Sequence, residues 1–339
     1  MKQLRFLVAR IDRIGDVVLS TPLPREIKKK YPDSFVAVLV RHYTKDIYLN
    51  NPDVDAIICY DNSDSSKKSF WVLVKEIRKY QFSHGFMLLP NEKLNYALFI
   101  SGIRYRMGVG HKLYQFLTFT KYINRKKYIP LRHEADYCLD MVRKIGINVE
   151  TLDPVIYLTE TEKNRIKIIR KNILFDKKKL IGINVSSGNS APNLNPSEYL
   201  KLIHLLKENP EIKIAIMDKD ISEEMENIEG VIYPNKGNAL RDSIINLAAL
   251  DILISNSTGP MHICSSLQIP TLSLFCPLTA CSPKLWGPLG NKSEIILPAP
   301  NYCATQCPID PKKCDYSNPG GLTAEFISEK LTAFINKLN

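Results

Sequence analysis

Short runs of β-branched and other apolar residues alternate with segments of helical spacing along most of this chain. Residues 4–9 and 35–40 each form such a run, long enough for one buried strand. Apolar residues recur every three or four positions in the segments between such runs, as in residues 134–145. This alternation predicts an α/β fold class in which helices cover both faces of a parallel, doubly wound sheet.

The alternation starts again after about residue 155, with a charged helical segment at 159–174 and a strand at 180–185. A chain of 339 residues is long enough for two domains of roughly 150 residues each. We therefore expect one doubly wound domain over residues 1–155, a second over 156–322 and a closing amphipathic helix over 323–339. Because such sheets bind ligands beyond the carboxyl ends of their strands, the cleft between the domains is the expected site.

The net charge of +11 lies wholly in the first half of the chain. Residues 1–150 hold 26 basic against 15 acidic residues, whereas the rest holds 20 of each. No apolar run approaches the roughly 18 residues of a membrane helix, and the charged N-terminus does not resemble a signal peptide, so we expect a cytoplasmic protein. The charge favours an anionic partner, although no nucleic-acid-binding signature is present.

The turn after the first strand contains a candidate catalytic residue, Asp16. The turn has a single glycine, so it lacks the glycine-rich fingerprint of a dinucleotide site, and a nicotinamide dehydrogenase is disfavoured. Asp16 stands near the start of a helix, where it serves either as a cap or as a general base with basic neighbours that favour its ionised form. Composition alone leaves both interpretations open.

Two further segments suit a bound phosphate. Ser257, Thr258 and Gly259 precede a proline at the start of a helix, where free backbone N–H groups attract anions, and His262 follows one turn later. Ser186 and Ser187 follow a predicted strand in a small polar loop. The alternatives are a plainly capped helix with a buried histidine and a simple serine–glycine turn.

Two of these motifs together resemble one family. The patterns R-x-x-x-I-G-D-V-x-L-x-T-P, from Arg10, and S-T-G-P-M-H-I-x-x-x-L-x-I-P-T, from Ser257, are similar to those of glycosyltransferase family 9, which contains the ADP-heptose:lipopolysaccharide heptosyltransferases. The resemblance implies a GT-B architecture of two Rossmann-like domains, an acceptor-binding N-terminal half and a nucleotide-sugar-binding C-terminal half. It also implies that the last helix packs back on the N-terminal domain.

The resemblance further implies roles for individual residues. Asp16 would be the general base of an inverting transfer of heptose from ADP-heptose, the co-substrate, to a lipopolysaccharide inner-core acceptor of the Kdo/lipid A type. The donor would be held by Ser186, Ser187, Asn238, Ser257, Thr258, Gly259 and His262. No metal or other cofactor would be required, because a helix terminus and side chains neutralise the leaving diphosphate.

The chain departs from the family pattern before Pro196. Family members commonly place a basic residue and a tryptophan there, whereas this chain has Asn193-Leu194-Asn195. Lys219 or Lys236 is a hypothetical substitute for the missing cation. The departure leaves open a different nucleotide-sugar donor or acceptor, and a donor-binding protein with weak or no turnover.

Residues 104–132 form the candidate acceptor surface, with eight basic residues, no acidic residue and interleaved aromatics. Such a segment suits a phosphorylated glycolipid at the cytoplasmic face of the inner membrane, where we expect the protein to bind peripherally. The alternative is a solvated basic loop. The residues predicted to bind the acceptor are Arg13, Arg106, Lys112, Arg125 and Lys126.

Three of the eight cysteines cluster near the C-terminus, at Cys303, Cys307 and Cys314. Family members often have a fourth cysteine just before a leucine, where this chain has Gly321. Three thiolates hold a metal only if a fourth ligand comes from elsewhere. A remnant or a thiol-packed loop is the favoured interpretation.

Overall fold

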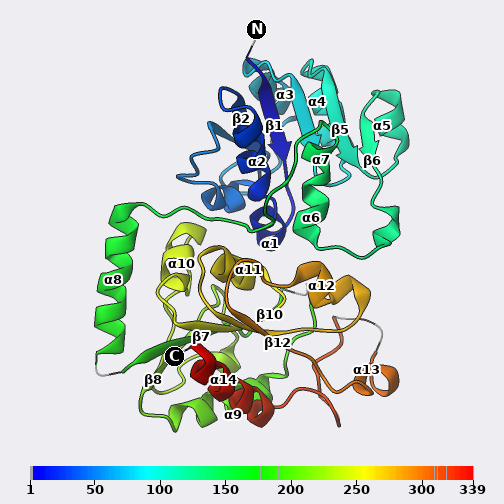
Figure 1. Ribbon diagram of the computed structural model, residues 1–339. Helices are drawn as coiled ribbons and strands as arrows, with labels where there is room; N and C mark the ends of the chain where they lie inside the picture. The colour runs from blue at the N-terminus through cyan, green and yellow to red at the C-terminus, as the bar shows by residue number, and fades with distance from the viewer. Residues whose placement is uncertain are drawn as a thin grey trace. The chain divides into compact units, whose positions relative to one another are not determined.

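The computed structural model describes residues 3–175, 177–188, 191–308, 310, 312–317 and 319–338 (Figure 1). The chain divides into two compact units, Met1–Tyr157 and Leu158–Asn339. Each unit is built on one six-stranded sheet in which all paired strands are parallel. The predicted α/β fold with doubly wound parallel sheets is confirmed.

The sheet of the first unit has the strand order β3-β2-β1-β4-β5-β6. Its strands are β1 Arg5–Ala9, β2 Phe35–Val40, β3 Ala56–Cys59, β4 His84–Met87, β5 Tyr105–Val109 and β6 Lys121–Ile123. The helices are α1 Ile14–Val18, α2 Pro22–Lys30, α3 Phe70–Lys79, α4 Glu92–Ile100, α5 Leu113–Leu117, α6 Glu134–Cys138 and α7 Asp140–Arg143, with 3₁₀ turns at His42–Ile47 and Lys126–Tyr128. The order reverses between β1 and β4, and such a switch point is where doubly wound sheets bind ligands.

Both faces of this sheet are buried, because alternate residues of each strand point to opposite sides. Leu7 and Ala9 of β1 pack in one cluster with residues of α3 and α4, such as Leu73 and Leu94. Phe6 and Val8 point to the other face and are also fully buried. Burial on both sides explains why the strands read as continuous apolar runs.

The second unit repeats the topology of the first, with the order β12-β11-β10-β7-β8-β9 and a switch point between β7 and β10. Its strands are β7 Lys179–Ile183, β8 Ile212–Ile216, β9 Val231–Ile232, β10 Ile252–Asn256, β11 Thr271–Leu274 and β12 Ser293–Ile296. The helices are α8 Glu160–Leu174, α9 Pro196–Lys207, α10 Leu240–Leu247, α11 Gly259–Ser266, α12 Pro283–Trp286, α13 Tyr302–Thr305 and α14 Ala324–Leu338, with 3₁₀ turns at Glu223–Met225 and Thr279–Cys281.

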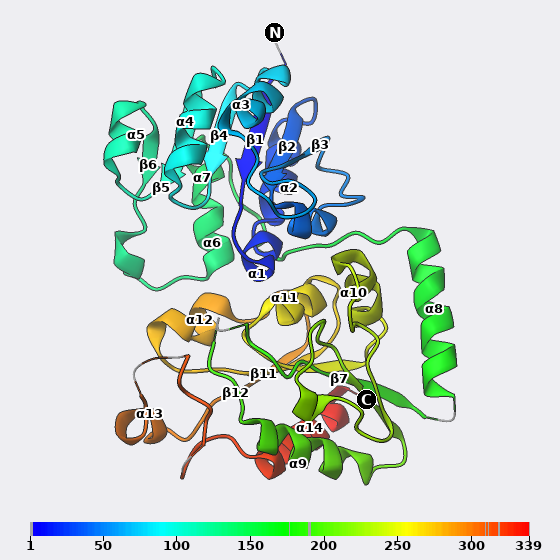
Figure 2. The same cartoon turned by 180° about the vertical axis from the view of Figure 1, so that it is seen from behind.

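The closing helix α14 packs beside α9 in the second unit (Figure 2). Its buried residues Ile327, Leu331 and Phe334 join the core cluster of that unit, together with Leu202 of α9. The family resemblance implied that this helix packs back on the N-terminal domain. The structure instead uses its apolar stripe to cover one face of the second sheet.

The single helix expected to begin near Asp16 is split into α1 and α2. Pro22 has no N–H group, so it cannot continue the hydrogen-bond ladder from the preceding turn. Ser20 and Thr21 also turn their hydroxyls back to the carbonyls of Val17 and Val18, at 2.7 and 2.8 Å. The break leaves α1 as a short turn that carries Asp16 directly after β1. Within the described parts of the chain, no helix is long and apolar enough to cross a membrane.

Candidate active site

Asp16 lies at the carboxyl end of β1 and forms an ion pair with Arg10. The guanidinium of Arg10 is 2.5 Å from the Asp16 carboxylate, 2.7 Å from that of Asp12 and 3.0 Å from that of Glu134. Arg10 is 3% exposed, and Glu134 comes from α6, far along the chain. One buried cation therefore holds three carboxylates at the switch point of the first sheet.

The three carboxylates differ in how accessible they are. The Asp16 side chain is 18% exposed, whereas that of Glu134 is 2% exposed and also pairs with Arg125 at 2.7 Å. Glu134 is thus a structural counter-ion. Asp16 is held by an ion pair, as one expects of a residue that must be positioned, yet a ligand can reach it.

Burial raises the pKa of Asp12 to about 6, although Arg10 opposes the shift. An unfolded aspartate titrates near 4, so the folded state binds the proton of Asp12 more tightly than the unfolded state does. The resulting contribution to the unfolding free energy is fully present below about pH 4. It is lost as the pH rises through about 6. We expect the unfolding free energy of the natural protein to fall by up to about 3 kcal/mol, relative to the Asp12→Asn variant, between pH 4 and pH 7. Urea denaturation of both proteins across this range measures the difference; parallel curves would contradict it.

At the switch point of the second sheet, one buried network joins three loops. Asp218, after β8, accepts hydrogen bonds from the Asn184 side chain at 2.6 Å and from the Ser186 amide at 3.0 Å. The Asn184 side-chain oxygen in turn accepts from Thr258 at 2.9 Å and from Ser255 at 3.2 Å. The loops that follow β7 and β10 are therefore fixed together, and Asp218 and Asn184 are site residues that the sequence analysis missed.

The predicted donor residues fall into two groups by accessibility. Ser186, Ser187, Ser257, Gly259 and Asn238 are exposed or half-buried. Thr258 and His262 are buried within the loop and α11. Because the Thr258 hydroxyl bonds to Asn184 and does not cap α11, the first turn of this helix has no side-chain cap. Ser257 and Gly259 flank that helix start, as an anion site requires.

A cavity of about 340 Å³ lies beside the Ser186 loop. It is lined by residues 186–188, 191 and 193–196 and by residues 312–315 of the cysteine-containing loop. The two segments are joined, because the amides of Asn193 and Asn195 donate to the carbonyls of Cys314 and Asp315, both at 3.2 Å. The cavity thus combines hydroxyl groups with two lysines, Lys312 and Lys313, that the sequence analysis did not assign to the site.

Lys312 and Lys313 are better placed at this cavity than the two lysines first considered. Both are exposed side chains on its wall, on a turn closed by Asp310. Lys236 instead pairs with Glu226 at 3.0 Å, and neither it nor Lys219 lines the cavity. The segment that lacks a basic residue before Pro196 is therefore faced by two lysines from a distant part of the chain.

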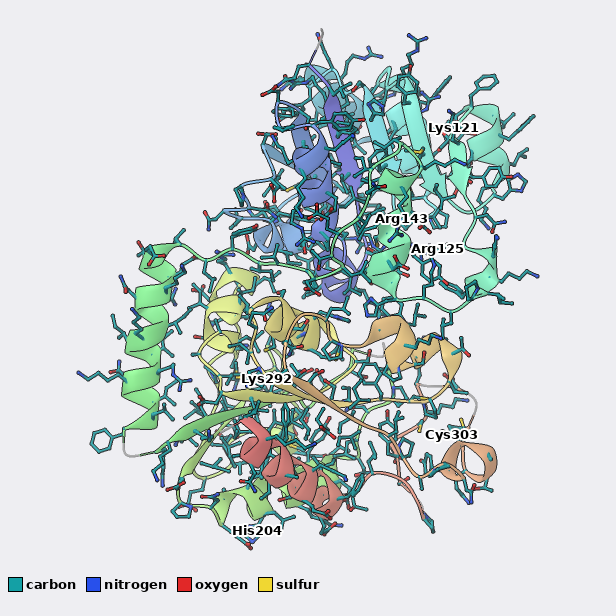
Figure 3. The ribbon with its side chains drawn as sticks, in the orientation of Figure 1. Lys121, Arg125, Arg143, His204, Lys292 and Cys303 are labelled. Atoms are coloured by element: carbon teal, nitrogen blue, oxygen red, sulfur yellow. The ribbon has the colours of Figure 1, made fainter. Side chains whose placement is uncertain are left out.

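The predicted acceptor residues fall into two groups, one exposed to solvent and one held by contacts within the protein. Arg13, Lys112 and Lys126 are exposed. Arg106 is buried and donates to the carbonyls of Ile103 and Thr118, whereas Arg125 pairs with the buried Glu134 of α6 (Figure 3). Their placement on the acceptor surface is corrected, because both guanidiniums are used to hold the backbone and a buried carboxylate.

The cysteine cluster gains a fourth member in the structure. The thiols of Cys303, Cys307 and Cys314 are half-buried, and Cys276, after β11, lies near them. Burial raises the pKa of Cys303 to about 11, and its three neighbouring thiols add to the shift. Among the described residues, no three His, Cys, Asp or Glu side chains are arranged to hold a metal ion. Cys303 and Cys314 instead pack against the hydrophobic core of the second unit.

The chain is similar to known sugar transferases in sequence. The model of glycosyltransferase family 9 (heptosyltransferase) matches residues 238–312. A glycosyltransferase of provisional assignment from Haemophilus influenzae is 27% identical over 306 residues, which cover 86% of this chain and 88% of that protein. Lipopolysaccharide heptosyltransferase 2 of Escherichia coli is 20% identical over 313 residues, with the same coverage of 86% and 88%.

Solved structures share the fold over the whole chain. A family 9 glycosyltransferase of Veillonella parvula has a TM-score of 0.78 at 20% identity and covers 99% of this chain and 97% of its own. An E. coli heptosyltransferase solved with ADP has a TM-score of 0.68 at 14% identity, covering 98% and 100%. Two Rossmann-like units of this kind form the GT-B architecture, and the family match together with the named relatives supports a glycosyltransferase. The chain is thus similar to glycosyltransferase family 9 in its sequence motifs, in the family match over residues 238–312 and in its fold.

Proposed function

We propose that this enzyme transfers heptose, with inversion, from ADP-heptose to a lipopolysaccharide inner-core acceptor of the Kdo/lipid A type. The part of this proposal that concerns the donor is supported by the hydrogen bonds that join Asp218, Asn184 and Thr258. These bonds fix the polar loops after β7 and β10 at the switch point of the second sheet. Named heptosyltransferases among the relatives, and the ADP bound by one similar structure, support an ADP-sugar donor.

The proposed reaction divides its steps between the two units. An acceptor hydroxyl oxygen attacks the anomeric carbon of the donor, its proton passes to Asp16, and the bond from that carbon to the diphosphate breaks to release ADP. The start of α11, the Ser186 loop and the two lysines neutralise charge that develops on the leaving diphosphate. These groups supply the neutralisation, so the proposed reaction requires no metal ion or other cofactor.

For the acceptor we propose an anionic glycolipid, bound by exposed basic residues of the first unit. Arg13 lies in the loop between β1 and Asp16, and Lys112 and Lys126 are exposed farther along the acid-free segment. Their positive charge suits the phosphates and carboxylates of such a lipid. The protein would then act at the cytoplasmic face of the inner membrane, bound peripherally.

A donor panel tests this function. Isothermal titration of the purified full chain with ADP-heptose, other nucleotide-sugars and ADP should show the tightest sugar-dependent binding for ADP-heptose. Tighter binding of another nucleotide-sugar would replace the proposed donor. Binding without ADP release when acceptor is added would favour a donor-binding protein instead, an alternative motivated by the uncharged segment before Pro196.

The lysines at the cavity give a separate prediction. We expect the double variant Lys312→Ala/Lys313→Ala to raise the donor KM by about tenfold, which corresponds to the loss of one charge-assisted hydrogen bond. The double variant Lys219→Ala/Lys236→Ala is the matched control, because it also removes two positive charges, both outside the cavity. Steady-state kinetics at saturating acceptor measures KM. Equal effects in all variants would show that the cavity is not the diphosphate site.

A further inference from the structure

The segment formed by α5 and the residues up to Thr120 exposes apolar side chains and buries polar ones. Its apolar side chains face solvent: Leu113 is 74% exposed, Phe116 77% and Phe119 84%. Its polar side chains Gln115 and Thr118 are buried. Surface helices of globular proteins show the opposite pattern, with the apolar stripe toward the core.

A buried hydrogen-bond network fixes this orientation. The Asn95 side chain of α4 donates to the Thr118 hydroxyl at 2.8 Å and accepts from the Thr120 hydroxyl at 3.0 Å. Gln115 donates to the carbonyl of Val109 at 3.2 Å, and the buried Arg106 donates to the carbonyl of Thr118. Turning the segment over would leave these polar groups buried without partners, which is unfavourable. The apolar residues are therefore held outward by the core beneath them.

The exposed Phe119 also has a strained backbone conformation. This residue has a φ of 54°, in the left-handed region that bulky side chains rarely adopt. Such a conformation persists only where the surrounding structure over-determines it, and it is common at binding sites. The strained backbone and the buried hydrogen bonds are independent features. Both favour the conformation in which the apolar side chains of this segment are exposed to solvent.

The surroundings of this apolar surface are basic. Lys112 and Lys121 flank α5, and Lys126 and Lys127 follow β6, the edge strand of the sheet (Figure 1). Residues 104–132 contain no acidic residue. Exposed Tyr122 and Ile129 extend the same region. Exposed apolar side chains next to exposed lysines in one acid-free segment complement a lipid bilayer with anionic headgroups.

We propose that Leu113, Phe116, Leu117 and Phe119, here called the apolar tip, insert into the interfacial layer of an anionic membrane. The lysines around the tip then contact the headgroups. This inference deepens the proposed function, on which it rests for the membrane-bound acceptor, by naming the element that carries the protein to the lipid surface. It does not depend on which sugar is transferred.

Vesicle sedimentation tests the proposal without donor or acceptor. Phosphatidylglycerol/phosphatidylethanolamine vesicles should bind the natural protein, and Phe116→Ser/Phe119→Ser should weaken that binding at least tenfold, because two exposed aromatic anchors are lost. The control is Phe175→Ser, which removes a 94% exposed phenylalanine from the second unit and should leave binding unchanged. Circular dichroism checks that each variant is folded. Raising the salt concentration should weaken binding, and phosphatidylcholine vesicles should bind poorly.

Two results would overturn the proposal. One is unchanged vesicle binding by the Phe116→Ser/Phe119→Ser variant. The other is absence of vesicle binding together with self-association that this variant abolishes, which would assign the apolar tip to a second copy of the chain. Transfer to a lipid-free acceptor separates the two claims, because it should persist in this variant if only membrane docking is lost and should be absent from every variant if the proposed function fails.

Discussion

Replacing Asp16 with asparagine is expected to lower kcat by about 10²–10⁴-fold, the usual contribution of a positioned general base. Asparagine has nearly the same shape, so the short helix α1 should persist, but the side chain cannot accept the proton of the acceptor hydroxyl. Donor affinity should stay unchanged, because the predicted donor residues lie in the second unit. Turnover and donor binding, measured on the same preparation, separate these effects.

Asp12→Asn is the matched control for this variant. It removes a carboxylate from the same loop and the same Arg10 guanidinium, at 2.7 Å, but leaves Asp16 in place. We expect a change in kcat of less than tenfold at pH 7. If Asp12→Asn abolished turnover and Asp16→Asn did not, the base would be Asp12 and the assignment made from the sequence motif would be wrong.

The second large effect concerns stability. Arg10→Met is expected to destabilise the first unit by about 3 kcal/mol, because it removes a cation from three carboxylates, one of which is fully buried. The cost lies at the low end of the usual range of roughly 3–5 kcal/mol, since Arg125 remains beside Glu134 at 2.7 Å. Denaturant titration in a Trp286→Phe background leaves Trp71 as the only tryptophan, so its fluorescence reports the first unit.

A double-mutant cycle controls for simple loss of side-chain contacts. Glu134→Gln removes the buried charge, so Arg10→Met should cost substantially less in that background than in the natural chain. Arg10→Lys keeps the charge but not the fork that reaches several carboxylates, and an intermediate loss is expected. Equal costs of Arg10→Met with and without Glu134 would show that the ion pair between these residues contributes nothing measurable.

Most of the fold could be predicted because its central strands are buried on both faces. Such strands are continuous apolar runs, and β1 and β2 follow the predicted runs at 4–9 and 35–40 closely. The start of α9 at Pro196 is also marked in the sequence, because Asn195 caps the helix and proline occupies its first turn. Periodicity and local capping suffice for elements of this kind.

Other elements could not be found from periodicity. The edge strands β3, β6 and β9 contain only two to four residues each, too short for an alternating pattern to stand out. The helix α5 misleads any pattern-based method, since its apolar residues face solvent and its buried partners are polar. That inversion depends on Asn95 of α4 and Arg106 of β5, which lie outside the helix itself.

Candidate site residues that belong to a local sequence motif could be predicted. Those that only tertiary contacts bring to the site were missed. Asp16 and Ser257 follow strands at the two switch points, as their positions in the sequence suggested. Asp218 and Lys312 belong to no local motif, and only the fold brings them to the Ser186 loop. Arg106 shows the reverse error, because a basic residue between aromatics suggested a surface group, yet it is needed to anchor the chain beneath α5.

The most direct test of the central claim is a coupled measurement of ADP release and acceptor mass. Purified full-length protein is incubated with ADP-heptose and a Kdo–lipid A acceptor, with Asp16→Ala as the matched inactive variant. The account predicts ADP release in step with the appearance of a heptosylated acceptor, and loss of both signals in Asp16→Ala. Release that persists undiminished in Asp16→Ala, or donor binding with neither ADP nor product formed by the natural enzyme, would contradict it.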